Sequence, residues 1–165
     1  RHRPHIAIPR VNNQTPRAYF NNERAMLVDA NFSGLWLGSG AALDEFALLS
    51  LLNSTWMQAA MELSASLLGG GAAKLEASHL RLLPVPHGLI TVADKLSTLG
   101  KGLTIEPPLH QHALRREIDR AILSLFGGRA GQQASWSDLT SIGVQARERR
   151  STSKWRKARQ DANTG

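Results

Sequence analysis

The sequence predicts an α+β fold, with a small antiparallel β-meander, then a mainly helical part and finally a basic, flexible C-terminal tail. Three observations predict it. Between residues 5 and 37, short apolar runs alternate with the turn formers Asn, Pro and Gly, as in consecutive short strands. Beyond Gly40, apolar residues recur at helical spacing. After Ala146 the chain is rich in Arg, Lys and Ser and has too little apolar surface to hold itself rigid.

The β part is expected to contain four strands, because four β-like runs are separated by turn formers. Pro9 and the segment Asn12-Asn13-Gln14 separate the first two runs, and Asn21-Asn22 and Asn31 separate the others. Successive runs of this kind are typical of an antiparallel meander. The four expected strands are residues 5–8, 17–20, 25–28 and 34–37.

The central helical segment covers residues 42 to about 67. Its apolar residues occupy nearly every side of a helix, which is typical of a buried helix. The segment is either one helix or two helices that meet near Asn53-Ser54-Thr55. Gly69-Gly70-Gly71 is expected to stop it, because glycine strongly favours the end of a helix.

Three further helices are expected. Residues 91 to about 99 form a short helix, and Gly100-Lys101-Gly102 is expected to be the loop after it. Residues 112–126 form the clearest amphipathic helix, with one apolar stripe, and Ser135 is the expected cap of a last helix. The outer face of the amphipathic helix is expected to carry Arg115, Arg116, Asp119 and Arg120.

The positive charge is concentrated at both ends of the chain. The sequence has 20 Lys and Arg residues against 13 Asp and Glu, a formal net charge of +7. Residues 1–24 hold five Arg and one Glu, and the last twenty residues hold seven basic and two acidic groups. Lys and Arg neutralise phosphates and release counterions, so the two basic ends favour a polyanion met by two surfaces. A tail that is merely solvated is the alternative.

Two absences limit the class of protein. The sequence has no cysteine, so it offers neither a disulfide framework nor a thiolate site, which is compatible with a reducing cytoplasm. No segment approaches the roughly 20 continuous apolar residues that a membrane-spanning helix needs. We therefore expect a cytoplasmic protein without a membrane partner.

Three segments in a fixed order resemble adenine-specific DNA methyltransferases of restriction-modification systems. They are Leu51-Leu52-Asn53-Ser54 with the helix after it, the Gly-rich loop at residues 69–75, and the exit Leu80-Arg81-Leu82-Leu83-Pro84-Val85-Pro86. In those enzymes this order is found in the C-terminal target-recognition region, and similar endings occur in type I specificity subunits. The resemblance covers about residues 5–90, and the helix at 112–126 is similar to the one that commonly follows.

The resemblance implies a division of the chain and a set of partners. Residues 1–90 would be a target-recognition region, 91–146 a helical C-terminal region and 147–165 a basic tail. The implied partners are double-stranded DNA, the parent enzyme's own catalytic domain and a restriction subunit. S-adenosylmethionine would bind in that catalytic domain, and no cofactor is expected in this chain.

The chain itself is not expected to catalyse methyl transfer. Amino-methylating enzymes need an Asn, Asp or Ser before a Pro-Pro pair and an aromatic residue after it, to hold the flipped base. The one Pro-Pro pair, in Glu106-Pro107-Pro108-Leu109, lacks both. Because the sequence starts at Arg1 and not at a methionine, we expect the catalytic half to lie upstream. We assign no catalytic residue, since no acid, base and nucleophile cluster together in the sequence.

Two kinds of side chain are expected to contact DNA. Arg makes paired hydrogen bonds to guanine, and Asn or Gln makes them to adenine, so the turns of the N-terminal segment would read bases. The bare amides of the Gly-rich loop and the basic groups of the loop and tail would bind phosphates. The expected DNA-binding residues are Arg10, Asn12, Asn13, Gln14, Arg17, Asn21, Asn22, Arg24, Gly70, Gly71, Lys74, Arg149, Arg150, Lys154, Arg156 and Lys157.

Alternatives to these interpretations stay open at the level of the sequence. Asn-Asn pairs also serve as plain turn residues, and the Gly-rich loop also serves as a plain helix stop. Gly38-Ser39-Gly40 is expected to be a turn and not a cofactor site, because a short glycine pattern is weak by itself. For the whole chain, the alternative is a protein-interaction module that docks through the helix at 112–126 without reading DNA.

Overall fold

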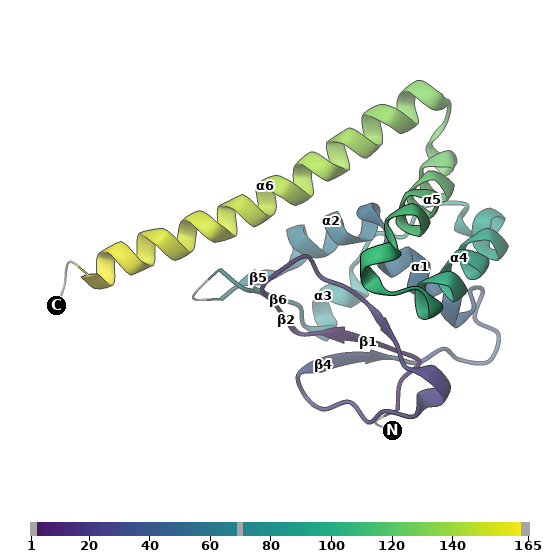
Figure 1. The fold of residues 1–165 in the computed structure, drawn as a ribbon, viewed down its shortest axis with the longest axis horizontal. Coiled ribbons are helices and arrows are strands. Elements are labelled where there is room, and N and C mark those ends of the chain that lie inside the picture. Colours follow the sequence, from purple (N-terminus) through teal and green to yellow (C-terminus); the bar gives the residue numbers. More distant parts are fainter. Residues whose placement is uncertain (1–2, 69–70, 163–165) are drawn as a thin grey trace.

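The computed structural model describes residues 3–68 and 71–162, without the side chains of Pro108, Gln132 and 151–162. Small antiparallel sheets lie at one end of the body, a group of helices packs beside them, and one long helix crosses the body and extends past it (Figure 1). The α+β class, with a small β part before a mainly helical part, is confirmed.

The first sheet has three antiparallel strands in the order β3-β1-β4. Strand β1 (Ile6–Pro9) lies in the centre, between β3 (Tyr19–Phe20) and β4 (Phe32–Leu35). Ile6 is opposite Phe20 on one side and Leu35 on the other. The first run of the sequence therefore pairs with both later strands, so the strands do not follow one another in sequence order.

The expected strand at residues 25–28 is wrong. A short 3₁₀ turn, η1 (Asn22–Arg24), is followed there by a loop in which Met26 and Leu27 are exposed. The buried Asn21 side chain holds this loop, because its Nδ2 donates to the carbonyls of Pro4 (3.0 Å) and Met26 (2.8 Å) while its Oδ1 accepts from the Met26 amide (2.9 Å). These bonds take the place of a strand pairing.

The second sheet joins the N-terminal segment to the Gly-rich loop. Strand β2 (Val11–Asn12) pairs with β6 (Ala73–Lys74), and β6 pairs with β5 (Ser66–Leu67). The helix before them ends at Ser64, so Gly69-Gly70-Gly71 does not stop it as expected. Gly71 lies in the connection between β5 and β6 and has a φ of +80°. Gly69 and Gly70 lie outside the described residues.

The central helical segment consists of two helices, as one of the two predictions had it. Helix α1 (Glu45–Leu52) begins with Asp44, whose carboxylate accepts from the Ala47 amide at 2.7 Å. Helix α2 (Thr55–Ser64) begins with Ser54, whose hydroxyl accepts from the Met57 amide at 3.1 Å. Both are N-caps that satisfy a backbone donor of the first turn. A short helix, α3 (Ala77–Arg81), follows the hairpin.

Helix α4 (Ala93–Ile105) runs through Gly100-Lys101-Gly102, so the loop expected there is wrong. It follows the 3₁₀ turn η2 (Leu89–Val92) and packs closely against α1. A Cβ on Gly100 would collide with the carbonyl oxygen of Phe46 and lie 2.9 Å from Oγ of Ser50. Glycine is thus present because the two helices touch, although it is a poor helix former by itself.

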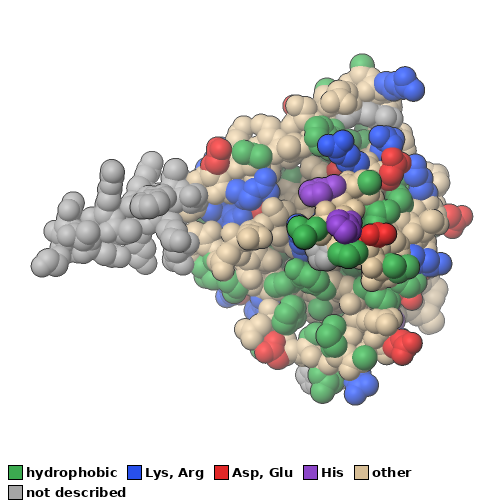
Figure 2. Space-filling model, in the orientation of Figure 1, with side chains coloured by type: hydrophobic (Ala, Val, Ile, Leu, Met, Phe, Trp, Pro, Cys, Tyr) green, Lys and Arg blue, Asp and Glu red, His purple; other side chains and the backbone are tan. Residues whose placement is uncertain are grey.

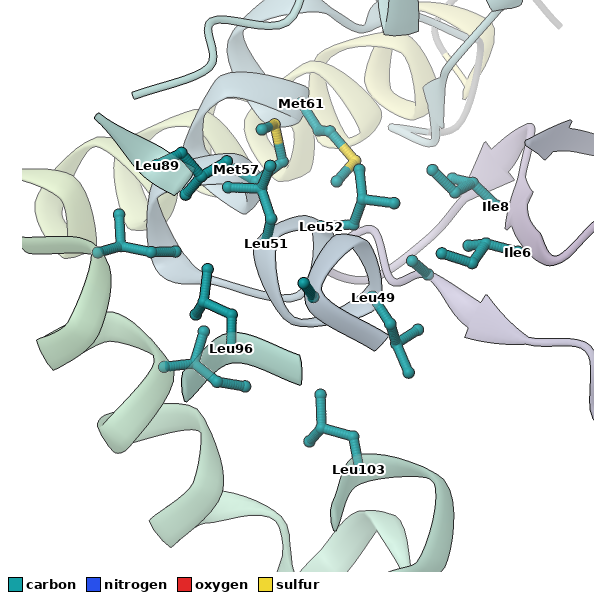
Figure 3. Packing of buried hydrophobic residues seen from close by; sticks show 14 of the residues in the cluster. Ile6, Ile8, Leu49, Leu51, Leu52, Met57, Met61, Leu89, Leu96 and Leu103 are labelled. Atoms are coloured by element: carbon teal, nitrogen blue, oxygen red, sulfur yellow. The ribbon is translucent and has the colours of Figure 1, made fainter. Parts of the chain in front are cut away.

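One hydrophobic core joins the sheets to the helices. Ile6 and Ile8 of β1 point toward helices α1 and α2, and Leu96 of α4 lies on the opposite side of α1 (Figure 3). Helix α5 (His112–Leu123) follows the 3₁₀ turn η3 (Pro108–His110), and the 3₁₀ turn η4 (Ser124–Phe126) continues it. Its Ile118 and Ile122 are fully buried in the same core. Residues 1–90 and 91–146 therefore share one core.

The last helix, α6, spans Arg129–Ala162 and so starts before Ser135, the expected cap. It packs along α2 (Figure 1). The prediction of a flexible tail from residue 147 is wrong for 147–150, because Arg150 is only 3% exposed and bonds to three other segments. Residues 151–162 continue the helix. Among the described residues, no helix is long and apolar enough to cross a membrane.

Candidate nucleic-acid interface

Five of the expected DNA-binding residues lie exposed on the N-terminal segment. We call them the N-terminal polar face: Asn13, Gln14, Arg17, Asn22 and Arg24. The first three line one hollow of about 300 Å³ together with Thr15 and Tyr19. Arg24 lies on the turn η1, where its backbone and that of Glu23 take left-handed angles (φ of 52° and 49°). The exposed amides and guanidiniums of this face are open to a ligand in solution.

Asn12 and Asn21 are buried, which removes both from the surface that can read bases. The Asn12 side chain is 8% exposed and donates from Nδ2 to the Pro9 carbonyl at 2.8 Å. Asn21 is 2% exposed and makes the three backbone bonds that shape the loop after it. For these two residues the alternative of plain turn residues is the one that the structure favours.

Arg150 is also buried and has a structural role. Its Nη2 donates to the Glu62 carboxylate at 2.8 Å, and its Nη1 donates to the carbonyls of Asn12 (3.2 Å) and Gly71 (3.3 Å). One guanidinium thus ties α6 to α2, to β2 and to the Gly-rich hairpin. Burial raises the pKa of the Glu62 carboxyl, and the nearby Arg150 and Arg147 oppose this rise.

Arg10 and Lys74 are half-exposed and share one carboxylate. Lys74 Nζ lies 2.6 Å from Glu76 Oε1, and Arg10 Nη2 lies 3.7 Å from the same oxygen. Arg10 also donates to the Ala30 carbonyl at 3.1 Å. The hydrogen bond and positive charge of Lys74 hold the pKa of Glu76 below its ordinary value, because they outweigh the effect of burial, which raises it. Part of the charge of both basic groups is therefore neutralised within the protein.

The remaining expected residues belong to the hairpin and to α6. Gly71 is half-buried, and its carbonyl accepts a hydrogen bond from Arg150. Arg149 is exposed on α6. Gly70 and the side chains of Lys154, Arg156 and Lys157 lie outside the described residues. In the orientation of Figure 2, basic and acidic side chains alternate over the body, so charge of one sign does not cover this face.

A cavity of about 480 Å³ opens beside the N-terminal polar face. It lies between strand β3 and the ends of α4 and α5, and Arg17 and Tyr19 line both this cavity and the smaller hollow. Leu49 and Leu103 contribute apolar surface to it. Its polar lining consists of Arg17, Tyr19, Asn22, Asn53, Thr104, Glu106, Gln111 and Arg115.

Arg115 is the residue of this cavity that sequence analysis misplaced. It was expected on the outer face of the amphipathic helix, but it is half-buried and donates to the carbonyl of Asn53 (3.3 Å) and to Oε1 of Gln111 (3.1 Å). Gln111 in turn donates to the Leu103 and Glu106 carbonyls at the end of α4. Gln111, Arg115 and Asp119 are four residues apart and therefore share one side of the helix. This polar stripe was the signal in the sequence that could have placed Arg115 beside Gln111.

Asp119 was expected on the outer face as well, and it is buried. Its carboxylate accepts from the amide of Thr55 (2.7 Å), the hydroxyl of Thr55 (2.5 Å) and Nε1 of Trp136 (3.3 Å). It lies at the N-terminus of α2, where the helix dipole favours a negative charge. Burial nevertheless raises the pKa of Asp119, against the hydrogen bonds from Thr55 and Trp136.

The Leu-Asn-Ser segment, which carried part of the resemblance, links the cavity to the core. The buried Asn53 side chain donates from Nδ2 to the carbonyls of Ala18 and Leu49, each at 3.0 Å, and accepts from the Ala18 amide at 3.3 Å. Asn53 thereby holds the backbone between Arg17 and Tyr19 against the end of α1. The segment has a structural role in placing the cavity wall.

Comparison with known proteins adds no family to this description. No protein-family model matches the chain, and neither the curated proteins nor the solved structures contain a match. Among the described residues, no group of three or more His, Asp or Glu side chains is arranged to hold a metal ion. The candidate site is thus an exposed set of amides and guanidiniums next to a cavity with two arginines.

Proposed function

We propose that this chain is a DNA-binding, target-recognition module of an adenine-specific DNA methyltransferase. The observation that carries the proposal is the N-terminal polar face, where exposed amide and guanidinium groups lie on turns of the N-terminal segment. Asn13, Gln14 and Arg17 line one hollow, and Arg17 continues into the larger cavity. Turns that project from a packed scaffold are a common place for binding residues.

The chemistry of the face suits the edges of DNA bases. An Arg side chain matches the two acceptors of guanine, and an Asn or Gln side chain matches the acceptor and donor of adenine. Arg17 and Arg24 would supply the first kind of contact or a phosphate contact. Asn13, Gln14 and Asn22 would supply the second. With Asn12 and Asn21 buried, the proposed readers are fewer than the sequence suggested.

The rest of the proposed enzyme would lie outside these 165 residues. A catalytic domain would bind S-adenosylmethionine and flip the target adenine, and this chain would hold the duplex beside it. A restriction subunit is a further proposed partner, and the proposed place of action is the cytoplasm. The basic residues at 154–159 would add contacts that act on all sequences alike.

The rival function, docking on a protein through the helix at 112–126, has less support. The apolar stripe of α5 is used by the protein's own core, where Ile118 and Ile122 are fully buried. Its outer surface carries Arg116, Glu117 and Arg120, and Glu117 pairs with Arg120 and with Lys95. Docking through an apolar helix face would require α5 to leave the core.

Selection from a pool of randomised DNA duplexes tests the proposal. The wild-type chain is expected to enrich a preferred sequence, and its affinity is expected to fall steeply with salt. The triple variant Asn13→Ala/Gln14→Ala/Asn22→Ala removes amides but no charge, so it should lose the preference and keep the salt dependence. The matched control, Gln133→Ala/Gln145→Ala, removes two exposed amides of α6 and should keep the preference.

Two results would contradict the proposal. One is a wild-type chain that binds no duplex even at low salt. The other is a triple variant that enriches the same sequence as the wild-type chain, in which case the N-terminal polar face does not read bases.

A chain ended after Arg150 lacks four basic residues and one acidic residue. It should bind all duplexes more weakly and still select the same sequence.

A further inference from the structure

The cavity between β3 and the ends of α4 and α5 is lined by two arginines, Arg17 and Arg115. Among the described residues, no carboxylate forms an ion pair with Arg17 or Arg115. Asp119 is the acidic residue whose charge acts most on Arg115, but its oxygens are already engaged by Thr55 and Trp136. The Arg115 bonds go to a carbonyl and an amide, which are neutral acceptors.

The two arginines are also close enough to affect each other. Burial lowers the pKa of Arg115, and the positive charge of Arg17 lowers it further. Two like charges in a half-enclosed space raise each other's energy, unless an anion lies between them. Glu106 supplies one carboxylate to the cavity wall, but it forms no ion pair with either arginine. Within the described residues, both guanidiniums therefore lack a directly paired carboxylate.

The form of the cavity suits a phosphate group with an attached ring. Its volume of about 480 Å³ falls within the usual range of small-ligand sites. Arg115 is held in place by Asn53 and Gln111, so its remaining donors are oriented in advance. Tyr19 is half exposed and lines the same cavity, so its ring can pack against a sugar, and Asn22 and Thr104 offer neutral polar groups.

We propose that Arg17 and Arg115 form a phosphate-binding subsite, which takes a backbone phosphate of nucleic acid with the adjacent sugar against Tyr19. The nucleic-acid source of the phosphate rests on the proposed function. A phosphorylated small molecule has the same chemistry and is the other source. Arg115 is the fixed member of the pair and Arg17 the exposed one, so bound phosphate would pull the Arg17 side chain toward the cavity.

Salt-dependent binding of a random-sequence DNA duplex by the 165-residue chain tests the subsite. Arg17→Ala should weaken binding about tenfold or more and lower the salt slope by about one, because one phosphate contact is lost. Arg17→Lys should restore the slope. Arg115→Lys keeps the charge and loses the held geometry, so it should weaken binding with little change in slope. Arg116→Ala, an exposed arginine of the same helix away from the cavity, is the control.

A second measurement separates the two sources of phosphate. Inorganic phosphate and a mononucleotide are titrated while the backbone amide signals of residues 17–22 are followed by NMR, with chloride as the ionic control. We expect both probes to shift these signals in the wild-type chain and not in Arg17→Ala. Retained dispersion of the other signals shows that the variant is folded.

Each outcome decides between the proposals. If the wild-type chain binds duplex and the Arg17 and Arg115 variants behave as Arg116→Ala does, the subsite is wrong and DNA binding stands. If the wild-type chain binds no duplex but the mononucleotide shifts the cavity signals, the subsite stands with a small phosphorylated ligand and the proposed function fails. If neither duplex nor phosphate binds, both are overturned.

Discussion

Arg150 of the C-terminal helix and Glu62 of α2 form a buried ion pair, with 2.8 Å between Nη2 and Oε1. The side chains are 4% and 0% exposed. The same guanidinium bonds the carbonyls of Asn12 and Gly71, so it fixes three segments that are far apart in the sequence. The pair ties α6 to α2, and the bond to the Asn12 carbonyl ties α6 to the residue before Asn13 of the N-terminal polar face.

Arg150→Ala is expected to lower the free energy of unfolding by about 3–5 kcal/mol, because it leaves Glu62 as a buried charge without its partner. Urea denaturation followed by circular dichroism measures the change. Arg129→Ala, an exposed arginine at the start of α6, should change stability by less than about 0.5 kcal/mol. A loss of similar size in both variants would contradict a special role for Arg150.

Removal of both charges should restore stability. The double variant Glu62→Leu/Arg150→Met replaces the pair by apolar side chains, and such replacements are often neutral or stabilising.

A chain ended after Ala146 lacks Arg150 and should be as unstable as Arg150→Ala, whereas a chain ended after Arg150 should keep the pair. Equal stability of the two shortened chains would show that the pair contributes little.

The raised pKa of Asp119 gives a pH dependence of defined sign. Its folded-state pKa lies above the unfolded value of about 3.9, so between the two values the folded protein holds more protons. The contribution of this group to stability therefore falls as pH rises through that window. Urea denaturation from pH 4 to 8 should show the wild-type protein losing stability relative to Asp119→Asn with rising pH. The exposed Asp138→Asn should track the wild-type protein.

Gly100→Ala is expected to destabilise the protein by about 1–3 kcal/mol or more, because the added Cβ meets the backbone of Phe46 and forces α1 and α4 apart. The control is Gly131→Ala on α6, where a Cβ would meet no atom within 4 Å. There alanine should add up to about 1 kcal/mol through its higher helix propensity. The urea midpoint should therefore fall for Gly100→Ala and rise for Gly131→Ala. A rise for both variants would show that a methyl group fits between α1 and α4.

Asn53→Ala is expected to cost about 2–3 kcal/mol, since it leaves the buried amide of Ala18 without its acceptor and removes two donated bonds. Amide exchange at Ala18 should become faster than in the wild-type protein. Asn13→Ala, an exposed amide without these bonds, should change neither stability nor exchange. Unchanged protection of Ala18 in the Asn53 variant would mean that strand pairing alone holds this segment.

Short-range patterns in the sequence predict the fold class and most of the helices. Apolar spacing placed α1, α2 and α5, and the caps Asp44 and Ser54 start helices where a capping side chain meets an apolar run. These features depend on neighbours within four residues along the chain, so a pattern in the sequence is enough to find them. The exposed turn with Asn13, Gln14 and Arg17 was found for the same reason.

Three residues whose roles the sequence did not predict depend on contacts between distant parts of the chain. Gly100 looked like a loop residue and serves a helix contact, and Arg150 looked like a tail residue and lies buried against Glu62. Arg115 looked like an outer-face residue and lines the cavity with Arg17, which is 98 positions earlier in the sequence. In each case the partner is distant along the chain. The energy of burying a polar group, or of adding a methyl group, depends on that partner, and local sequence carries no record of it.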